Sequence, residues 1–371
     1  MLGPISGLLP GMLWALERRR FVLAGAALVA IPLSGQLHLA LGAIPLFAAY
    51  AVVRTRERRA LVAAAGAVGA AVVAGLAVKD VAVEGSLAGA GRSLRAVTFF
   101  SPDWQDFAYR ELRHPPPIAP EYALFLGRLT PVLAVAGLVM LVLRRHYALA
   151  ALFGLAVAIP VWLALGTNVP TYEWLWRYVD PFRYPRVPER LMPIAALGIA
   201  ALVAVAVSRR PTPLVVAVAL VALFVDLRLE VYGAAAADPG NRAYAALVHA
   251  APGRVLELPA FPPERHWGGV YLYYAMEAPR ERVGGYSTTA PRAADRVLDA
   301  LRPLQCGAWG ASREALLRRL GVRYVVVHGG LYRASPLVAP ACRQRAESGL
   351  RRHGWRELAR DGPVALYTAP S

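Results

Sequence analysis

Charged side chains and cysteines are scarce in this chain of 371 residues. Only 18% of the residues are Asp, Glu, Lys or Arg, and 57% are apolar, whereas a soluble domain usually has about 25% charged and 45–50% apolar residues. The two cysteines are too few for a small domain held together by disulfides, and the apolar content excludes disorder and collagen. The shortage of charge therefore predicts a membrane protein.

Familiar catalytic and ligand-binding motifs are also missing. The sequence has no GxSxG, GxxxxGK[ST] or strand-linked GxGxxG segment, and no CxxC or HExxH spacing. These absences argue against a serine-hydrolase elbow, a nucleotide-phosphate loop and a conventional zinc site. The seven histidines are scattered, so their spacing predicts no metal site, and a divalent cation is the one candidate cofactor.

Long apolar runs dominate the first 230 residues. The strongest are Leu61–Val78, Tyr122–Leu143, Tyr147–Gly166, Leu191–Ser208 and Pro213–Leu227. Each is close to the roughly 20 residues that span a bilayer as a helix. The longer run Phe21–Val53 predicts two short helices turning at Ser34–His38, with a kinked or re-entrant segment as the alternative. We therefore expect an α-helical transmembrane bundle of about seven segments, at 21–33, 37–53, 61–78, 122–143, 147–166, 191–208 and 213–230.

Arginine placement predicts the orientation of this bundle. The short loops at 18–20, 54–59, 144–145 and 209–210 contain 11 Arg, and the only acids in or directly beside them are Glu57 and Glu17. Loops 79–121 and 166–190 contain nine basic and nine acidic residues. The positive-inside rule then places the N-terminus in the cytoplasm. Residues 231–371 then become an extracytoplasmic domain of an inner-membrane protein, periplasmic if the cell is Gram-negative. Because much of the net charge of +17 is explained as a topology signal, we expect no nucleic-acid partner.

Residues 231–371 have the pattern of a small α/β domain. Strands are predicted at Arg254–Pro259, Arg323–His328, Trp355–Arg360 and Val364–Thr368, the last two joined by the turn Asp361-Gly362. Helices are predicted at Ala293–Leu304, at Ser312–Leu320 with Ser312 as N-cap, and at Pro336–His353. Cys306 and Cys342 either form a disulfide, worth about 3–4 kcal/mol in this setting, or remain two separate buried thiols.

The first outer loop contains a pair of carboxylates, Asp103 and Asp106, followed by His114. Carboxylates three residues apart can share one helix face, where they act as a general base or bind a metal. They are weak catalytic candidates, and His114 is a candidate for substrate binding. The alternative is an interfacial segment in which the Asp caps a short helix and Trp104 lies at headgroup depth.

The second outer loop is richer in arginine and aromatic residues. Arg183, Arg186 and Arg190 are spaced three and four apart beside Tyr184, just before an apolar run. Their guanidinium groups are suited to gripping a lipid-linked phosphate bidentately, and all four residues are substrate-binding candidates. The alternative is general headgroup affinity with ion pairs to Asp180 and Glu189. Upstream aromatics, Trp174, Trp176 and Tyr178, predict a helix lying in the membrane interface.

The run PFRYPRVPERLMPIAALGIAALVAVAV (181–207) resembles the arginine- and proline-rich segment before a late helix in bacterial GT-C glycosyltransferase-like membrane proteins. SGQLH (34–38), RVLELP (254–259), VGGYSTTAP (283–291) and LGVRYVVVH (320–328) follow the same order as segments of that group. The resemblance implies a polyprenyl-phosphate sugar donor and a catalytic Asp or Glu in the first outer loop. No residue here matches that acid, so we expect an N-terminally truncated or incomplete enzyme, with a separate N-terminal membrane subunit as a possible partner.

The arginine-rich loop, the family resemblance and the predicted outer domain lead to two hypotheses about function. The first is a glycosyltransferase, or part of one, that moves a hexose or pentose from a polyprenyl phosphate at the outer membrane face. The second is a non-catalytic protein of the cell envelope whose outer domain binds a glycan or a protein.

Overall fold

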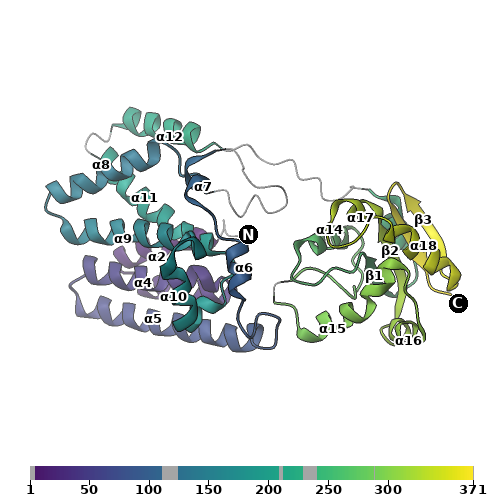
Figure 1. Cartoon of the computed structure of the whole chain (residues 1–371). Coiled ribbons are helices and arrows are strands. Elements are labelled where there is room, and N and C mark those ends of the chain that lie inside the picture. Colours follow the sequence, from purple (N-terminus) through teal and green to yellow (C-terminus); the bar gives the residue numbers. More distant parts are fainter. Residues whose placement is uncertain (1–4, 111–123, 209–211, 229–239, 288, 371) are drawn as a thin grey trace. The chain divides into compact units, whose positions relative to one another are not determined.

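The computed structural model describes residues 5–110, 124–208, 212–228, 240–287 and 289–370 (Figure 1). The chain forms two compact units. One comprises Met1–Glu84 and Gly89–Val231, and the other comprises Gly85–Ala88 and Tyr232–Ser371. We call them the helical unit and the sheet unit, and each is described by itself.

Four stretches of the helical unit are long and apolar enough to cross a membrane. They are α4 (Leu37–Arg54), α5 (Arg58–Val78) with the π-helix η1 (Lys79–Val83), α9 (Tyr147–Ala164), and the 3-10 turn η5 (Pro188–Leu191) with α11 (Met192–Val207). These four match the segments predicted at 37–53, 61–78, 147–166 and 191–208. Their length and composition are those of a membrane protein.

Four other apolar helices are shorter than these spans. They are α2 (Leu8–Glu17), α3 (Phe21–Leu33), α8 (Leu129–Leu143) and α12 (Pro213–Leu227). Helix α3 has the predicted bounds, α8 and α12 are shorter than predicted, and α2 was not predicted. At 1.5 Å per residue, the 13 residues of α3 extend about 20 Å, short of the roughly 30 Å hydrocarbon core. The predicted turn after α3 is confirmed, because α3 ends at Leu33 and α4 begins at Leu37. Gly35 supplies the left-handed conformation there, with φ at +78°.

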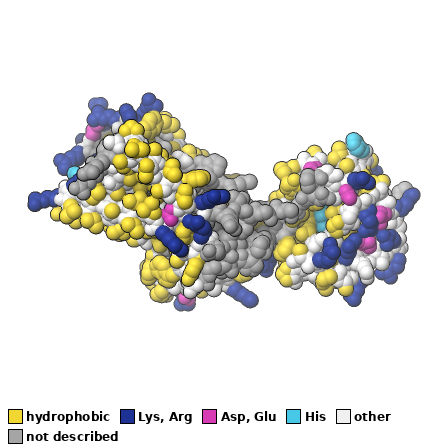
Figure 2. Space-filling view, turned by 90° about the horizontal axis from the view of Figure 1, so that it is seen from above, with side chains coloured by type: hydrophobic (Ala, Val, Ile, Leu, Met, Phe, Trp, Pro, Cys, Tyr) yellow, Lys and Arg dark blue, Asp and Glu magenta, His cyan; other side chains and the backbone are white. Residues whose placement is uncertain are grey.

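The helices pack around small side chains. Helix α3 packs against α5, and α11 packs against α8 and α9. Gly137 on α8 lies so close to the backbone of α11 that a Cβ there would come within 1.9 Å of the Leu202 carbonyl oxygen. Many large apolar side chains point outward instead, among them Val62, Val73, Val132, Leu155 and Phe224. Figure 2 shows hydrophobic side chains over much of the visible described surface of this unit, as expected for helices that face lipid.

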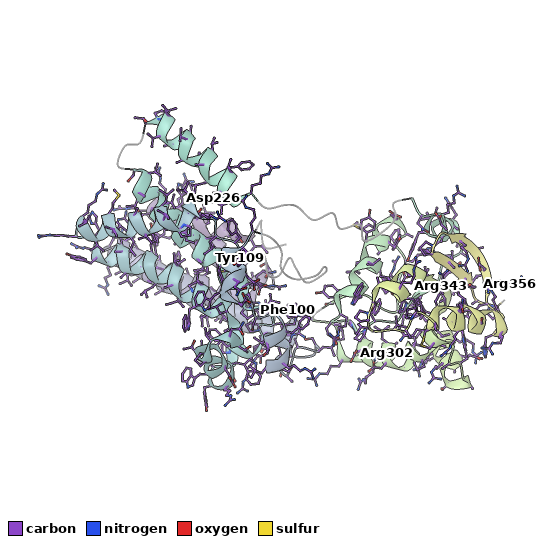
Figure 3. The ribbon with its side chains drawn as sticks, turned by 45° about the horizontal axis from the view of Figure 1, so that its top comes forward. Phe100, Tyr109, Asp226, Arg302, Arg343 and Arg356 are labelled. Atoms are coloured by element: carbon purple, nitrogen blue, oxygen red, sulfur yellow. A yellow bond between two sulfur atoms is a disulfide. The ribbon has the colours of Figure 1, made fainter. Side chains whose placement is uncertain are left out.

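An aspartate joins α12 to the start of α8. The Asp226 carboxylate accepts hydrogen bonds from the backbone N–H groups of Arg128 (2.9 Å), Leu129 (2.8 Å) and Thr130 (3.3 Å) (Figure 3). These are N–H groups that the helix itself leaves unpaired. The charged side chain that ends α12 therefore serves as the N-terminal cap of another helix.

The two loops predicted to lie outside the membrane pack against each other. Thr167 donates to Thr98 (3.0 Å), and Asn168 donates to the Pro102 carbonyl (2.7 Å). At Gly166, where φ is +55°, a Cβ would meet the Ser101 hydroxyl at 2.1 Å, so glycine permits this close approach. The described residues 89–110 of the first loop and residues 166–190 thus form one polar layer at one end of the helical unit.

The sheet unit has four strands in the order β1-β2-β4-β3. They are β1 (Arg254–Leu258), β2 (Val322–His328), β3 (Arg356–Asp361) and β4 (Val364–Thr368). Strands β1 and β2 are parallel, whereas β2–β4 and β3–β4 are antiparallel. The four predicted strands and the hairpin at Asp361-Gly362 are confirmed, with shifts of one or two residues at some ends. The small sheet is thus as the strand pattern predicted, and the structure adds that its strand directions are mixed.

Helices cover both faces of this sheet. On one face lie α15 (Arg292–Leu301), the 3-10 turn η7 (Arg302–Cys306), α16 (Ala311–Arg319), α17 (Gly329–Ala334) and α18 (Cys342–Arg352), and on the other lie α13 (Arg242–His249) and α14 (Gly269–Glu277). Two predicted helix starts are wrong. Gly310, not Ser312, is the N-cap of α16. Helix α18 begins at Cys342 and not at 336, because Pro340 would stand inside the longer helix.

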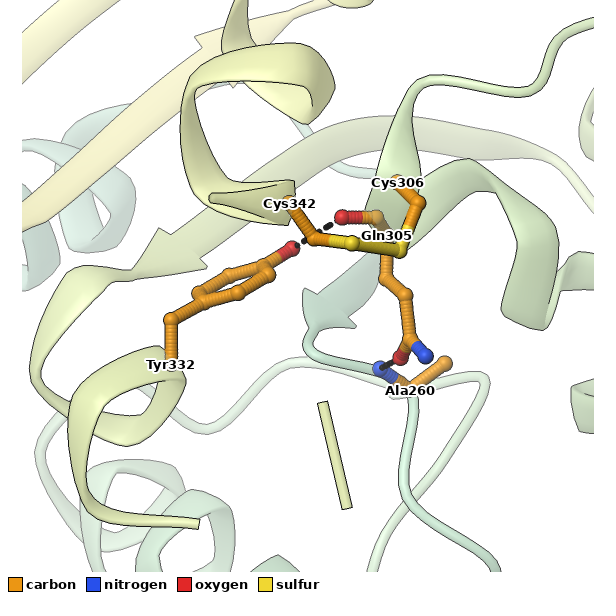
Figure 4. The surroundings of a disulfide bond; sticks show 5 residues. All are labelled: Ala260, Gln305, Cys306, Tyr332 and Cys342. Carbon is orange, nitrogen blue, oxygen red and sulfur yellow. Dashed lines mark hydrogen bonds between the residues drawn. A yellow bond between two sulfur atoms is a disulfide. The ribbon is translucent and has the colours of Figure 1, made fainter. Parts of the chain in front are cut away.

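The two cysteines form a disulfide. Cys306, at the end of η7, is bonded to Cys342, the first residue of α18 (Figure 4). Neighbouring Gln305 accepts a hydrogen bond from the Tyr332 hydroxyl at its backbone carbonyl (2.9 Å) and one from the Ala260 N–H at its side chain (3.1 Å). Of the two alternatives left open by the sequence, the structure contains the disulfide.

Candidate functional site

The candidate site is the arginine-rich segment of residues 180–190, which enters α11. Pro181, Pro185 and Pro188 prevent a regular α-helix here, and the chain instead forms the 3-10 turns η4 (Asp180–Arg183) and η5. We call this stretch the arginine segment. It lies within the polar layer formed by the two loops.

Arg183 holds the segment in place. Its guanidinium donates from Nε to the Trp176 carbonyl (3.2 Å) and from Nη2 to the Arg177 carbonyl (2.6 Å), near the end of α10 (Pro170–Tyr178). It also lies 3.5 Å from an Asp180 carboxylate oxygen. Because these bonds satisfy carbonyls at a helix C-terminus, the structure gives Arg183 a supporting role in addition to its predicted role in binding.

Three other arginines lie on the side of the segment that faces the start of α4. The 3-10 turn η5, which contains Arg190, packs against α4, and the charges of Arg92, Arg186 and Arg190 act on the ring of His38 in that helix. The Arg186 guanidinium lies 4.7 Å from the centre of the Phe100 ring, after α6 (Leu94–Phe99) (Figure 3). Arg92 belongs to loop 79–121, and its backbone N–H donates to the Arg183 backbone carbonyl (2.6 Å). The structure therefore brings Arg186 and Arg190 together and adds Arg92, which the sequence reading passed over.

Buried polar atoms mark the same end of the helical unit. Gln36 Oε1, His38 Nε2 and the Tyr172 hydroxyl are inaccessible and have no hydrogen-bond partner among the described residues. Tyr172 is 1% exposed, and burial together with the Glu189 charge raises the pKa of its hydroxyl. Since a buried polar group without a partner costs about 1–3 kcal/mol, such atoms are typical of a site completed by water or a ligand.

Two apolar grooves flank α4 and end at the arginine segment. The first, of about 470 Å³, runs between α4 and α5, and Lys79, Asp180 and Tyr184 line one end. Lys79, the only lysine in the chain, lies 5.6 Å from the centre of the Tyr184 ring. The second groove, of about 480 Å³, runs between α4 and α9 to Phe182 and Leu191. It follows α9 from Ala148 to Leu163, about 22 Å of helix.

The predicted acidic pair caps a short helix. Asp103 accepts from the N–H groups of Gln105 (2.7 Å) and Asp106 (3.2 Å), and Asp106 accepts from the Asp103 N–H (2.8 Å), at the start of α7 (Trp104–Ala108). This reciprocal arrangement is a capping box. Among the described residues, no group of three His, Cys, Asp or Glu is placed to hold a metal ion. His114 lies outside the described residues, so its predicted role stays a prediction.

The predicted interfacial helix is α10. Trp174 and Tyr178 are exposed, and their ring centres lie 5.6 Å apart. Trp176 instead turns inward, where its Nε1 donates to the Arg92 carbonyl (3.0 Å). Two of the three aromatic residues predicted for the membrane interface thus face outward, while Trp176 joins the two loops.

The sheet unit contains a buried polar network that the sequence reading missed. Glu257 on β1 accepts from the Tyr244 hydroxyl (2.9 Å) and Arg282 Nε (3.0 Å), and it lies 2.8 Å from His328 Nε2. Burial opposes ionisation of Glu257, but the His328 hydrogen bond and charge and the Arg282 charge outweigh it and hold the pKa of this carboxyl below its ordinary value. The side chains of Glu257, His328 and Arg282 are 1%, 3% and 6% exposed, so loss of one partner would leave a buried charge without compensation.

Comparison with protein-family models, with curated proteins and with solved structures finds no match to this chain. Functional inference therefore rests on the geometry of the site itself.

Proposed function

We propose that this chain is a membrane protein that binds a polyprenyl-phosphate-linked sugar at the arginine segment and takes part in glycosyl transfer. One observation carries the proposal: two long apolar grooves end at residues of the arginine segment, which also contains Arg186 and Arg190. A phosphate on a hydrocarbon chain combines the two chemistries found side by side there. Guanidinium groups bind phosphate bidentately, and the grooves suit the chain.

The groove between α4 and α9 favours a long hydrocarbon chain. Its course of about 22 Å along α9 exceeds half of the roughly 30 Å hydrocarbon core, so it is longer than the reach of one leaflet. A polyprenyl chain is long enough to follow such a groove through the membrane. The length of the groove therefore favours a polyprenyl carrier over an ordinary phospholipid.

Transfer of the sugar needs a carboxylate base for the acceptor hydroxyl, and a cation to stabilise the leaving phosphate. Arg186 and Arg190 are suited to the second task, with or without a divalent cation. Asp103 and Asp106 remain candidates for the first, although their oxygens already accept backbone N–H groups. The capping box is the observation that favours the second candidate function, a non-catalytic envelope protein that binds the lipid-linked sugar, a glycan or a protein.

The same proposal includes about seven membrane segments, a cytoplasmic N-terminus and an extracytoplasmic sheet unit in a bacterial inner membrane. Contacts between loops predicted to share one side support this topology. Loops 79–121 and 166–190 are hydrogen-bonded to each other, and Arg19 pairs with Glu57 (3.3 Å) between two loops predicted to be cytoplasmic. A disulfide in the sheet unit agrees with an oxidising compartment.

Replacing Arg186 and Arg190 by alanine is expected to weaken binding of a polyprenyl phosphate by at least about 100-fold, because hydrogen bonds to a charged group contribute about 1.5–3 kcal/mol each and both arginines are removed. The measurement is a titration of the purified full chain in detergent with undecaprenyl phosphate. Arg177→Ala is the matched control, since Arg177 lies in the same loop but pairs with Glu173. Equal affinity of the double variant and the control would remove the phosphate role.

A further inference from the structure

A charged pocket lies among the loops that join α2 to α3 and α4 to α5. It has a volume of about 310 Å³ and is lined by Leu16, Glu17, Arg19, Phe21, Arg54, Thr55, Arg56, Glu57 and Ala60. We call it the α2–α5 pocket. Because α4 ends at Arg54 and α5 begins at Arg58, the pocket lies at the ends of two candidate membrane spans, at the depth of lipid headgroups.

The acids of this pocket are already paired. Glu17 accepts from Arg54 Nε (2.7 Å) and from the Tyr50 hydroxyl (2.8 Å), and Glu57 lies 3.3 Å from Arg19. The connected segments 17–20 and 54–59 contain seven arginines against these two glutamates. The surplus cations with no partner among the described residues are Arg18, Arg56, Arg58 and Arg59. The pocket and its rim therefore have an excess of positive charge.

Apolar and aromatic groups accompany this charge. Leu16, Phe21 and Ala60 form part of the pocket wall. Trp14 is 49% exposed, and the Arg20 guanidinium lies 5.3 Å from its ring centre. Tryptophan is enriched at the headgroup level of membranes, and clustered arginines next to membrane helices recognise anionic lipids.

We infer that the α2–α5 pocket binds the phosphate headgroup of an anionic phospholipid from the leaflet that faces these loops. Arg19 and Arg56 contact the phosphate, and Leu16 and Phe21 pack against the start of the acyl chains. An anion fits because the glutamates are neutralised by Arg54 and Arg19 before any ligand binds. This inference does not depend on the proposed function, since the pocket and the arginine segment are formed by different residues.

The test is native mass spectrometry of the full chain in detergent, titrated with phosphatidylglycerol and, in parallel, with phosphatidylcholine. The wild type is expected to prefer phosphatidylglycerol, and Arg19→Gln with Arg56→Gln is expected to lower that affinity roughly 30-fold, at about fivefold per arginine. Arg56→Gln alone, which breaks no described pair, is expected to lower it about fivefold. Arg144→Gln with Arg145→Gln removes the same charge from another loop and should change affinity less than twofold.

Three outcomes would overturn the inference. The first is equal binding of phosphatidylglycerol and phosphatidylcholine by the wild type. The second is an equal loss of affinity in the control double variant and the pocket variant, which would show that the lipid responds only to net charge. Displacement of the lipid by an equal concentration of inorganic phosphate would show a site for a free anion in place of a lipid. If the double variant fails to fold, Arg56→Gln alone decides the question, because this substitution leaves both ion pairs of the pocket intact.

Discussion

Glu257→Gln is expected to lower the free energy of unfolding of the sheet unit by about 3–5 kcal/mol. The substitution keeps the shape of the side chain but removes the charge that the buried Arg282 guanidinium faces at 3.0 Å. Arg282 cannot lose its own proton, so it remains as an uncompensated buried charge. The effect is expected in hydrogen exchange of the β1 and β2 amides in the full chain, which reports on this unit separately from the membrane helices.

Glu281→Gln is the matched control. Glu281 also accepts from an arginine Nε, that of Arg254 at 2.6 Å, but the two side chains are 73% and 47% exposed. Exposed pairs contribute about 0–1 kcal/mol, so the control should alter exchange little. If both substitutions have the same small effect, the Glu257 network does not hold the two parallel strands together.

The pH dependence of the same unit follows from the lowered pKa of Glu257. A carboxyl group whose pKa is lower in the folded state contributes stability above its unfolded value, and this contribution is lost as the pH falls through the folded value. The stability of the sheet unit is therefore expected to fall as the pH drops below about 4.5, the ordinary pKa of a glutamate carboxyl. Glu357 acts in the same direction, because its hydrogen bond from Arg360 outweighs burial and lowers its pKa to about 2. In Glu257→Gln the loss of stability on acidification should be smaller than in the wild type.

Replacing Cys306 and Cys342 by alanine is expected to cost about 3–4 kcal/mol of sheet-unit stability. The disulfide closes a loop of 36 residues, and the chain entropy removed from the unfolded state by a loop of that length corresponds to this range. Exchange at the β2 and α18 amides is again the measurement. A reducing agent should accelerate exchange in the wild type and leave the double variant unchanged.

Alkylation of the unfolded, unreduced wild type provides an independent check on this bond. No thiol should react, because the chain has two cysteines and both are in the disulfide. Two alkylated thiols would show that the bond does not form, and the stability of the variant would then have to be explained by packing alone.

Apolar run length predicted the long helices well, because a lipid-facing helix needs an uninterrupted apolar sequence. It was less reliable at helix ends. Helix α8 begins at Leu129 although the apolar run starts at Tyr122, and α2 was not assigned at all. Turn chemistry predicted the break at Gly35 and the hairpin at Gly362, where φ is positive. The predicted start of α18 at 336 is wrong because Pro340 cannot stand inside a regular helix, which begins only at Cys342.

The site was only partly predictable from sequence for a related reason. Arg183, Arg186 and Arg190 stand together in the chain, whereas Arg92 lies in another loop and meets them only through the fold. Glu257 was missed because an alternating strand pattern suggests an outward-facing charge. In the structure, helices cover both faces of β1, and Glu257 is buried. A charged residue within a strand that is buried on both faces indicates a buried polar network, and Glu257 in β1 is such a residue.

The orientation predicted from the arginines is tested most directly by labelling single cysteines in intact cells with a membrane-impermeant maleimide. Tyr178→Cys places a thiol on exposed α10, beside the arginine segment, and Arg144→Cys places one in an exposed loop predicted to be cytoplasmic. The native cysteines give no background because they are bonded to each other. The account predicts that position 178 is labelled in intact cells and position 144 only after permeabilisation; the reverse pattern would contradict it.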